Sequence, residues 1–250
     1  SHNKNKIKEL VRDYVHPETG ELINKDRLDV GGLGKARFIL KEGGTLGDLY
    51  TQSDLKRDDN GMVDIDPTGI VAIENNLPDI KLGSVFPKAN LAWSNHFSWK
   101  GISLSALFTA RIGGIVYSAT EAAMDQYGVS ERSALARDNG GVLVNNRTLV
   151  DAQNYYTTIG SESGLPQYYT YNATNVRLQE ASIGYLIPRK WLGNVCDIQV
   201  SVIGRNLWMI YNKAPFDPES VATTDNYYQG IDYFMLPSTR NIGFNVKINF

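Results

Sequence analysis

Acidic side chains gather near the carboxyl-terminal end of the chain, where paired carboxylates could perform acid and base chemistry on a glycosidic bond. Asp217, Glu219, Asp225 and Asp232 share one polar segment. The sequence offers no second group to anchor a substrate beside them, and acids in loops are usually solvated. The run Gly160–Gly164 resembles a nucleophile elbow, but its central position holds a glutamate instead of a serine. We therefore expect no catalytic residues and no enzyme activity.

No residue pattern indicates a metal or cofactor site. Residues Asp64–Gly69 begin like a calcium-binding loop, but Asn75 stands where that loop needs a bidentate glutamate. His2, His16 and His96 lack the spacing of metal ligands. We expect a polar turn at the first of these segments, and neither metal nor cofactor in the protein.

Tyrosines are the remaining residues with binding chemistry. They stand among Asn, Gln and Asp in two long polar segments, where flat apolar rings beside hydrogen-bonding groups suit a sugar, a peptide or a protein partner. Tyrosine also anchors large ordered loops, so packing within the loops is an alternative that we place slightly above contact with a ligand or with a partner. The candidate contact residues are Tyr155, Tyr156, Tyr168, Tyr169, Tyr171, Tyr227, Tyr228 and Tyr233.

The overall composition is that of an ordinary β-rich chain. The 250 residues are 42% hydrophobic with a net charge of -2, and the mean hydropathy is -0.29. No run approaches the roughly 18 apolar residues of a membrane helix. The single cysteine, Cys196, excludes an internal disulfide, and the scattered charges give no basic stripe for nucleic acid. The first residues lack the apolar core of a signal peptide, so we expect processing or truncation before Ser1.

The last eleven residues, 240–250, alternate strictly between apolar and polar side chains. A tilted strand that crosses a bilayer needs about 9–11 residues with apolar side chains toward lipid and polar ones toward a wet lumen. Asn245 and Lys247 would face the lumen, and Phe250 supplies an aromatic carboxyl terminus. The residues expected to face lipid are Ile242, Phe244, Val246 and Ile248.

Other alternating runs, bounded by Gly, Pro and Asn, indicate about seven antiparallel strands. They are joined alternately by short turns and long connections, as in bacterial outer-membrane barrels, whose short turns are periplasmic. The carboxyl terminus is then periplasmic as well. The expected strands are 36–41, 46–52, 88–97, 102–112, 175–188, 197–209 and 240–250.

Tryptophans stand near the ends of these strands. Trp99 and Trp191 both fall in short turns, where we expect an interfacial aromatic belt instead of a soluble core. For Trp93 and Trp208 the sequence favours neither an aromatic belt nor a soluble core.

Four ordered motifs resemble the carboxyl-terminal end of SusC-type (SusC/RagA-like) TonB-dependent transporters of the Bacteroidetes outer membrane, and a fifth segment upstream is similar to the same family. The four motifs are Ala173–Leu192, Ser201–Leu207, Phe216–Glu219 and Leu236–Phe250, and the upstream segment is Lys41–Tyr50.

The resemblance implies an all-β fold, a large barrel of about 22 strands closed around an amino-terminal plug. About seven strands would then be the carboxyl-terminal third of that barrel. Alone they would leave two sheet edges unpaired, so the remaining barrel and plug must come from elsewhere. The implied partners are that remainder, the TonB complex acting through it, a SusD-like surface lipoprotein, outer-membrane lipid, and a glycan or peptide substrate. Phe250 resembles the terminal aromatic residue that barrel-assembly machinery recognises.

These expectations give a provisional organisation and function. Residues 1–34 form an extracellular loop or amino-terminal segment, and residues 35–250 form barrel strands with long extracellular loops at about 54–84, 113–172 and 211–239. The leading hypothesis is import of oligosaccharides or peptides across the outer membrane together with a SusD-like lipoprotein. The rival is a soluble all-β carbohydrate-binding module. A glycoside hydrolase would instead lose turnover when Asp217 or Glu219 is replaced.

Overall fold

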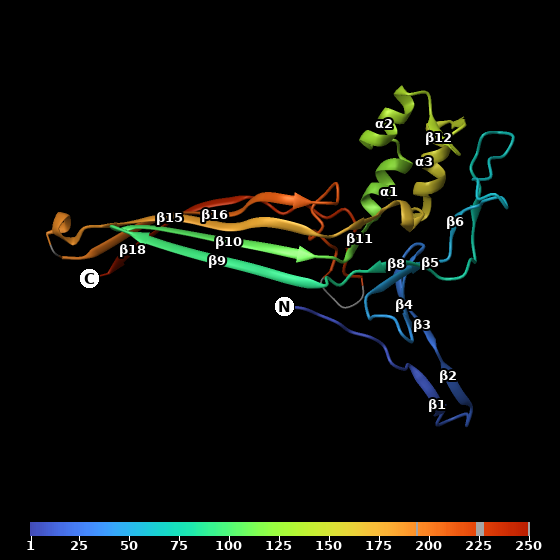
Figure 1. Ribbon diagram of the computed structural model, residues 1–250, viewed down its shortest axis with the longest axis horizontal. Helices are drawn as coiled ribbons and strands as arrows, with labels where there is room; N and C mark the ends of the chain where they lie inside the picture. The colour runs from blue at the N-terminus through green and yellow to red at the C-terminus, as the bar shows by residue number, and fades with distance from the viewer. Residues whose placement is uncertain (194, 224–227, 250) are drawn as a thin grey trace.

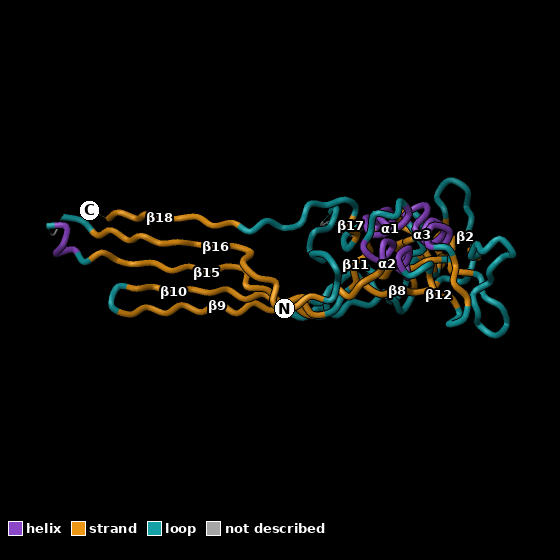
Figure 2. The backbone as a smooth tube through the Cα atoms, turned by 90° about the horizontal axis from the view of Figure 1, so that it is seen from above, coloured by secondary structure: helices purple, strands orange, loops and turns teal. Residues whose placement is uncertain are grey.

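The computed structural model describes residues 1–193, 195–223 and 228–249. Its largest element is a long antiparallel sheet that forms the left half of Figure 1, with the strand order β18-β16-β15-β10-β9. Its strands are β9 (Ala89–Trp99), β10 (Ile102–Ile112), β15 (Asn175–Ile187), β16 (Asp197–Asn212) and β18 (Asn241–Asn249). Figure 2 shows that these strands lie side by side in one layer, and no described element is packed on either face over most of their length.

One face of this sheet is apolar across all five strands. Its central row places apolar side chains directly opposite one another, in the order Phe244, Val202, Ile183, Leu104 and Phe97. All five are exposed, Phe97 at 63% and Phe244 at 82%. A folded protein in water seldom exposes a continuous apolar surface of this extent.

The opposite face is polar. The neighbouring row of paired residues lies one residue away from the apolar row on each strand. It contains Asn245, Ser201, Gly184, Ser103 and Ser98. Hydroxyl contacts link neighbouring strands on this face, as between Ser105 and Ser182, whose oxygens are 2.7 Å apart. The alternation that the sequence shows strand by strand therefore sums to one apolar and one polar surface.

Aromatic side chains mark two levels of the apolar face. Trp99 lies at the short-turn end, the end at which Trp191 stands in the turn η3 (Arg189–Leu192). A second row runs from Trp93 through Phe108 and Leu178 to Trp208, and the rings of Trp93 and Phe108 stack at 5.4 Å. Six residues of strand separate Trp93 from Trp99, roughly 20 Å.

Two of the expected strands exist but do not extend the long sheet. β4 (Ala36–Lys41) and β5 (Asp48–Thr51) pair with β3 (Arg27–Leu33) and β8 (Ile80–Ser84) in a separate sheet, which Figure 1 places beyond the end of the long sheet. Within the described residues the long sheet thus has five strands instead of seven. Six and four residues are too few for a crossing, and the fully buried Phe38 and Leu49 commit these strands to a globular core.

The segment that follows β10 contains three helices, although the sequence predicts a long connection there. They are α1 (Ala119–Gln126), α2 (Glu131–Asp138) and α3 (Ala152–Gly160). Their N-cap side chains, Ser118, Ser130 and Asp151, each accept a hydrogen bond from a backbone N–H of the first turn. Ser118 is followed three positions later by a glutamate, which is the spacing of a capping box and a signal of a helix start.

Short strands complete the elements around these helices. β11 (Ile115–Ser118) pairs with β14 (Thr170–Asn172) and, in parallel, with β17 (Ile231–Asp232). A narrow hairpin of β1 (Val11–Val15) and β2 (Leu22–Lys25) extends away from the body on the side opposite the helices in Figure 1. The remaining short pairs are β6 (Asp54–Leu55) with β7 (Ile73–Glu74) and β12 (Val142–Val144) with β13 (Thr148–Val150).

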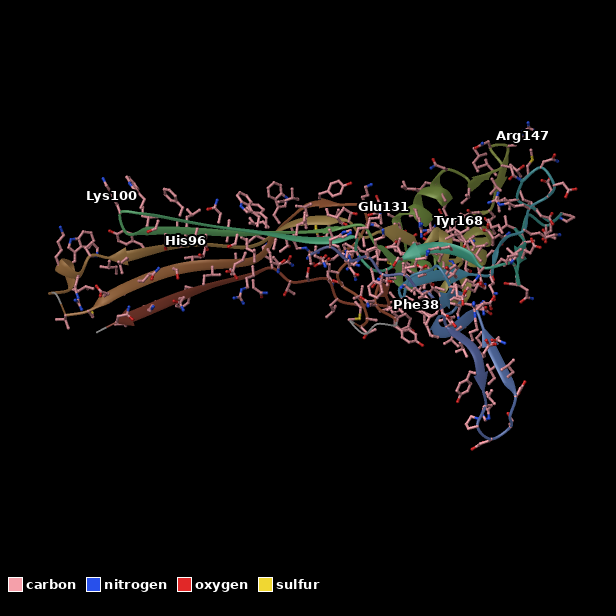
Figure 3. All side chains as sticks on the ribbon, turned by 60° about the horizontal axis from the view of Figure 1, so that its bottom comes forward. Phe38, His96, Lys100, Glu131, Arg147 and Tyr168 are labelled. Carbon is pink, nitrogen blue, oxygen red and sulfur yellow. The ribbon has the colours of Figure 1, made fainter. Side chains whose placement is uncertain are left out.

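The segment before β9 and the two long connections between the long strands pack together into one globular unit, which we call the head and define as the described residues of 4–88, 113–174 and 213–239. Its core joins side chains of all three segments, including Phe38, Leu49, Tyr117, Tyr169 and Ile231. In Figure 3 Phe38 and Tyr168 lie within this crowded unit, whereas His96 and Lys100 lie along the sheet. No described helix combines the length and the apolar composition that crossing a membrane would require.

Candidate functional site at the junction of sheet and head

The motif Ser201–Leu207 forms a bulge in β16. The register against β15 shifts at Asn206 and Leu207, which have no directly opposite partner. Asn206 has a φ of 52°, in the left-handed region that asparagine tolerates better than most residues. Gly204 leaves space for the bulge, because a Cβ there would lie 2.5 Å from the Leu207 side chain. A bulge can redirect a side chain, and here the amide of Asn206 points at the chain that enters β18.

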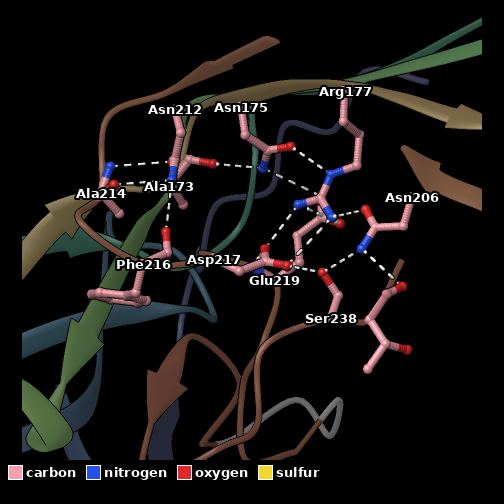
Figure 4. A network of polar contacts seen from close by, with 11 residues as sticks. Ala173, Asn175, Arg177, Asn206, Asn212, Ala214, Phe216, Asp217, Glu219 and Ser238 are labelled. Carbon is pink, nitrogen blue, oxygen red and sulfur yellow. Dashed lines mark hydrogen bonds and ion pairs between the residues drawn. The ribbon is translucent and has the colours of Figure 1, made fainter. Parts of the chain in front are cut away.

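Arg177 of β15 lies beside this bulge on the polar side of the sheet, with only 3% of its side chain exposed. Its guanidinium donates to Asp217 Oδ1 at 2.9 Å and lies 3.2 Å from Glu219 Oε2. Its Nε donates to the Asn175 amide oxygen at 3.3 Å. Figure 4 shows the guanidinium enclosed by these groups. A buried cation is tolerated only when it is paired and hydrogen-bonded in this way.

Asp217 also joins the network to the segment before β18. Ser238 donates its hydroxyl to Asp217 Oδ2 and accepts from the amide of Asn206 at 2.7 Å. The same amide lies 3.4 Å from the Thr239 carbonyl oxygen. We call the side chains Arg177, Asn206, Asp217, Glu219 and Ser238 the latch.

The turn that carries Asp217 is held from the end of β16. The amide of Asn212 donates to the carbonyl oxygens of Ala214 at 2.9 Å and Phe216 at 2.6 Å. The ring of Phe216 meets Tyr171 edge to face, with 5.6 Å between centroids. These amide and ring contacts therefore hold the turn that presents the two carboxylates to Arg177.

The charged groups of the latch stabilise a structural contact. Burial raises the pKa of Asp217, but hydrogen bonds from Arg177, Ser238 and the Glu219 backbone outweigh it, so the pKa lies below its ordinary value of 3.8. Both oxygens of Asp217 accept from these groups, and Glu219 accepts from Asn175 at 3.3 Å. A general acid or base needs an oxygen that can reach a substrate, whereas these carboxylates are occupied by structural partners.

Two of the predicted tyrosines lie in the interior of the head. Tyr169 is fully buried, and Tyr156 is 9% exposed. The hydroxyl of Tyr169 donates to Asp125 at 3.0 Å, and the guanidinium of Arg132 lies 4.8 Å from the centre of its ring. This placement favours the loop-packing alternative for these two residues.

Three further tyrosines are half-buried around that interior. Tyr155 meets Tyr156 edge to face at 5.4 Å, and burial raises the pKa of Tyr155 to about 12. Tyr168 stands at the end of the turn η2 (Pro166–Tyr168), and Tyr171 lies in β14. Each ring keeps an accessible part, so contact with a ligand or partner stays a prediction for Tyr155, Tyr168 and Tyr171.

Apart from Asp232, the remaining predicted residues lie at the surface or outside the described residues. Tyr228 and Tyr233 are 42% and 52% exposed. The residues predicted to face lipid, at alternate positions of β18 from Ile242 to Ile248, are all exposed on the apolar face. Tyr227, Phe250 and the acidic candidate Asp225 lie outside the described residues. Asp232 is buried and accepts a hydrogen bond from Ser118 at 2.6 Å.

Reasoning from the sequence names Asp217 and Glu219 as acidic candidates and the other latch residues only within motifs, and it assigns the five no common role. Each of the four motifs contributes to this one network: Arg177 comes from the first, Asn206 from the second, Asp217 and Glu219 from the third, and Ser238 from the fourth. The spacing between the motifs carries no signal of this contact, because the contact depends on the bulge in β16 and on the fold of the segment 213–239.

Comparisons with known proteins agree with this architecture. No family model matches the chain. A curated relative, the "TonB-dependent receptor P3" of Formosa agariphila, is 25% identical over 179 residues, which cover 66% of this chain and 17% of that protein.

Solved structures of the RagAB peptide importer share the fold. In the closed-closed state the match has a TM-score of 0.59 at 17% identity and covers 93% of this chain and 26% of the solved chain. In the open-open state the TM-score is 0.59 at 16% identity, with 100% and 26% covered. The chain thus spans about a quarter of the solved chains that it matches. The predicted all-β antiparallel fold and the resemblance to SusC-type TonB-dependent transporters are confirmed.

Proposed function

We propose that this chain forms part of the wall, the lumen surface and the outer loops of a SusC-like TonB-dependent transporter in the outer membrane. The transporter imports oligosaccharides or peptides together with a SusD-like lipoprotein, and the TonB complex supplies the energy through the remaining plug and barrel. The chain itself breaks no bond.

The observation that carries the proposal is the two-sided long sheet. Its apolar face is exposed from Phe97 on β9 to Phe244 on β18, and lipid is the solvent that such a surface suits. Its polar face, one residue away along each strand, suits a wet lumen. The strands of 9 to 16 residues are long enough to cross a bilayer at a tilt.

The two ends of the sheet support an orientation. Short turns, such as the one at Lys100, join strands at one end, and the head occupies the other. In outer-membrane barrels short turns face the periplasm and long loops face outward. The head is then extracellular and the carboxyl terminus periplasmic. Trp99 and Trp191 form the periplasmic aromatic belt, and the row of Trp93 and Trp208 forms the outer one.

The head is the part that meets the substrate and the lipoprotein partner. Exposed and half-buried tyrosines on it supply the contact chemistry, and the RagAB peptide importer offers the structural precedent for the fold. The latch holds the carboxyl-terminal segment of the head over the polar face. It therefore shapes the outer mouth of the transport path.

A soluble carbohydrate-binding module fits less well. Such a module buries one face of its sheet against a second layer, whereas Phe97, Trp93 and Phe244 are 63%, 61% and 82% exposed. A detergent-free preparation of residues 1–250 tests this directly. A cooperatively folded, soluble monomer would contradict the wall assignment.

Transport is tested with the full-length protein in the organism that encodes it. We expect deletion of its gene, and separately depletion of TonB, to abolish growth on one class of oligosaccharide or peptide as sole nutrient. An affinity tag on the protein should co-purify one surface lipoprotein from detergent extracts. Uptake that persists without TonB would contradict the proposal.

A further inference from the structure

A cavity of about 610 Å³ lies in the head between the helices and the start of the segment that carries the latch. Small-molecule sites typically occupy about 300–1,000 Å³. Its walls come from α1, α2, β14 and the chain after β16, which are brought together only by the tertiary fold. The lining includes Glu121, Met124, Val129, Arg132, Tyr171 and Lys213.

Three charged side chains on this wall, Glu121, Glu131 and Lys213, form no ion pair among the described residues. Glu121 is half-buried on α1, and no side chain in the described part of the protein donates to its carboxylate or pairs with it. Burial raises the pKa of Glu121 above its ordinary value. Lys213 is exposed at the opposite segment of the lining and likewise lacks an ion pair among the described residues. A half-buried carboxylate without a cation is costly unless a ligand supplies one.

The charges around Glu121 favour a ligand that places a positively charged group beside its carboxylate. Asp125 and Asp232 both oppose its ionisation, and only Arg132 favours it. Arg132 is already engaged, because its guanidinium lies 2.6 Å from Asp125. Among the described residues no group of three or more His, Cys, Asp or Glu side chains could hold a metal ion. An ammonium group of an organic ligand is a cation that can pair with a single carboxylate of this kind.

The rest of the lining can contact an apolar side chain and a carboxylate of a ligand. Met124 and the 70% exposed Val129 give an apolar wall, and the Tyr171 ring is fixed in place by Phe216. Lys213 can meet a carboxylate as a flexible point charge. A neutral oligosaccharide offers neither charge, whereas a short peptide carries both on a backbone with side chains.

We propose that this cavity binds short peptides, with the free amino terminus at Glu121, an apolar side chain against Met124 and Val129, and a carboxylate at Lys213. The inference rests on the proposed transport function, because it assigns the substrate class of that transporter. The cavity adjoins the latch through Phe216, which places the bound peptide at the outer mouth of the transport path.

The test uses the purified full-length transporter with its lipoprotein partner and a degenerate tripeptide library. Half of the library has free amino termini, and the other half is N-acetylated. The bound fraction is quantified by mass spectrometry for the wild type and for Glu121→Gln and Lys213→Gln. Glu18→Gln and Lys25→Gln, exposed positions of the β1–β2 hairpin, are the matched controls.

We expect free-amine peptides to be enriched about tenfold over their acetylated counterparts, since a charge-assisted contact is lost on acetylation. Glu121→Gln should remove that preference while leaving acetylated peptides bound as before, which shows that the site is still folded. Lys213→Gln should weaken binding of peptides with free carboxylates, and the hairpin controls should match the wild type. Equal binding of the two halves by the wild type, or an unchanged preference in Glu121→Gln, would overturn the inference.

A wrong peptide site can be distinguished experimentally from a wrong transport function. If uptake requires TonB and the nutrient is an oligosaccharide, with no selection among the tripeptides, the peptide site is wrong and the transporter assignment stands. If tripeptides are selected through Glu121 but their uptake does not require TonB, the site stands and the proposed transport function is wrong.

Discussion

The guanidinium of Arg177 and the carboxylate of Asp217, separated by forty positions in the chain, meet at 2.9 Å with 3% and 9% of their side chains exposed. Through this pair the segment 213–239 of the head is held against the long sheet directly before β18 begins. Because Asn206 and Ser238 complete the contact, its loss should affect both this segment and the start of the final strand.

Replacing Arg177 with alanine should loosen the segment 213–239. The change leaves the carboxylates of Asp217 and Glu219 near each other without a cation, and breaking a buried pair costs about 3–5 kcal/mol. Hydrogen exchange of peptides from this segment, measured on the full-length transporter, should accelerate strongly. Arg205→Ala is the control, since Arg205 and its partner Glu180 are 68% and 37% exposed, and such a pair contributes about 1 kcal/mol or less. Equal exchange in the two variants would contradict the fastening role.

The latch should weaken in acid. The folded-state pKa of Asp217 is lower than its ordinary value of 3.8, so its contribution is present above about that pH and is lost as the pH falls through the folded pKa. Thermal denaturation of the transporter from pH 6 to pH 2.5 should show this loss. In Asp217→Asn the acid-dependent decrease should be smaller, although stability at neutral pH is lower. Parallel pH profiles for the two proteins would exclude a contribution from Asp217.

Asn206 should tolerate glycine better than valine. Glycine keeps the left-handed φ but removes the hydrogen bond to Ser238, at a cost of about 0.5–1.5 kcal/mol. Valine removes the same bond and adds backbone strain of about 1–3 kcal/mol. The measurement is the fraction of folded protein in the outer membrane, judged by heat-modifiable mobility on gels. The order wild type, Asn206→Gly, Asn206→Val is expected, and any other order would be evidence against the bulge as a strained position.

A charge at Phe244 should disturb membrane assembly far more than one at Asn245. Phe244 lies opposite Val202 on the apolar face, and Asn245 lies opposite Ser201 on the polar face. A lysine facing lipid near the bilayer centre costs about 2–4 kcal/mol, whereas one facing the lumen is solvated. Phe244→Lys should lower the folded outer-membrane fraction, and Asn245→Lys is the control one residue away. Comparable losses in both would contradict the assignment of faces.

Tyr169→Phe should destabilise the helical part of the head without changing the sheet. The hydroxyl donates to the buried Asp125, and removal of a donor from a buried acceptor costs about 1–3 kcal/mol. Limited proteolysis should cut first between residues 119 and 169. Tyr233→Phe is the control, because Tyr233 is 52% exposed. If both variants resist proteolysis like the wild type, the tyrosine is not a packing anchor.

Much of the sheet could be predicted from local sequence, and little of the head. The alternation of β18, β10 and β16 fixes which side chains share a face, because successive residues of a strand point to opposite sides. Residues 36–41 and 46–52 are strands as predicted, but their alternation does not show which sheet they join. The helices follow cap signals such as Ser118 and Ser130, which are weak beside the Gly and Asn of the surrounding segment.

The candidate site also combines features that the local sequence predicts with features that depend on tertiary packing. The tyrosines were identified by type and setting, yet Tyr169 proves to be interior while Tyr233 stays at the surface, a difference that depends on which helices cover them. Glu121 stands only in the capping-box spacing after Ser118, and Lys213 stands in no motif, so the sequence indicates no binding role for either residue. They become notable only where the fold leaves both charges unpaired on one cavity wall.

The sequence by itself determined the strands, their two faces and the resemblance carried by four motifs, because side-chain direction in a strand is set by the local backbone period. Only the tertiary structure decided that the connections pack into one head, that the motifs meet at Arg177, and that Ser118 contacts Asp232 across 114 positions. Such contacts depend on which surfaces become buried against each other, and no local pattern along the chain encodes that choice.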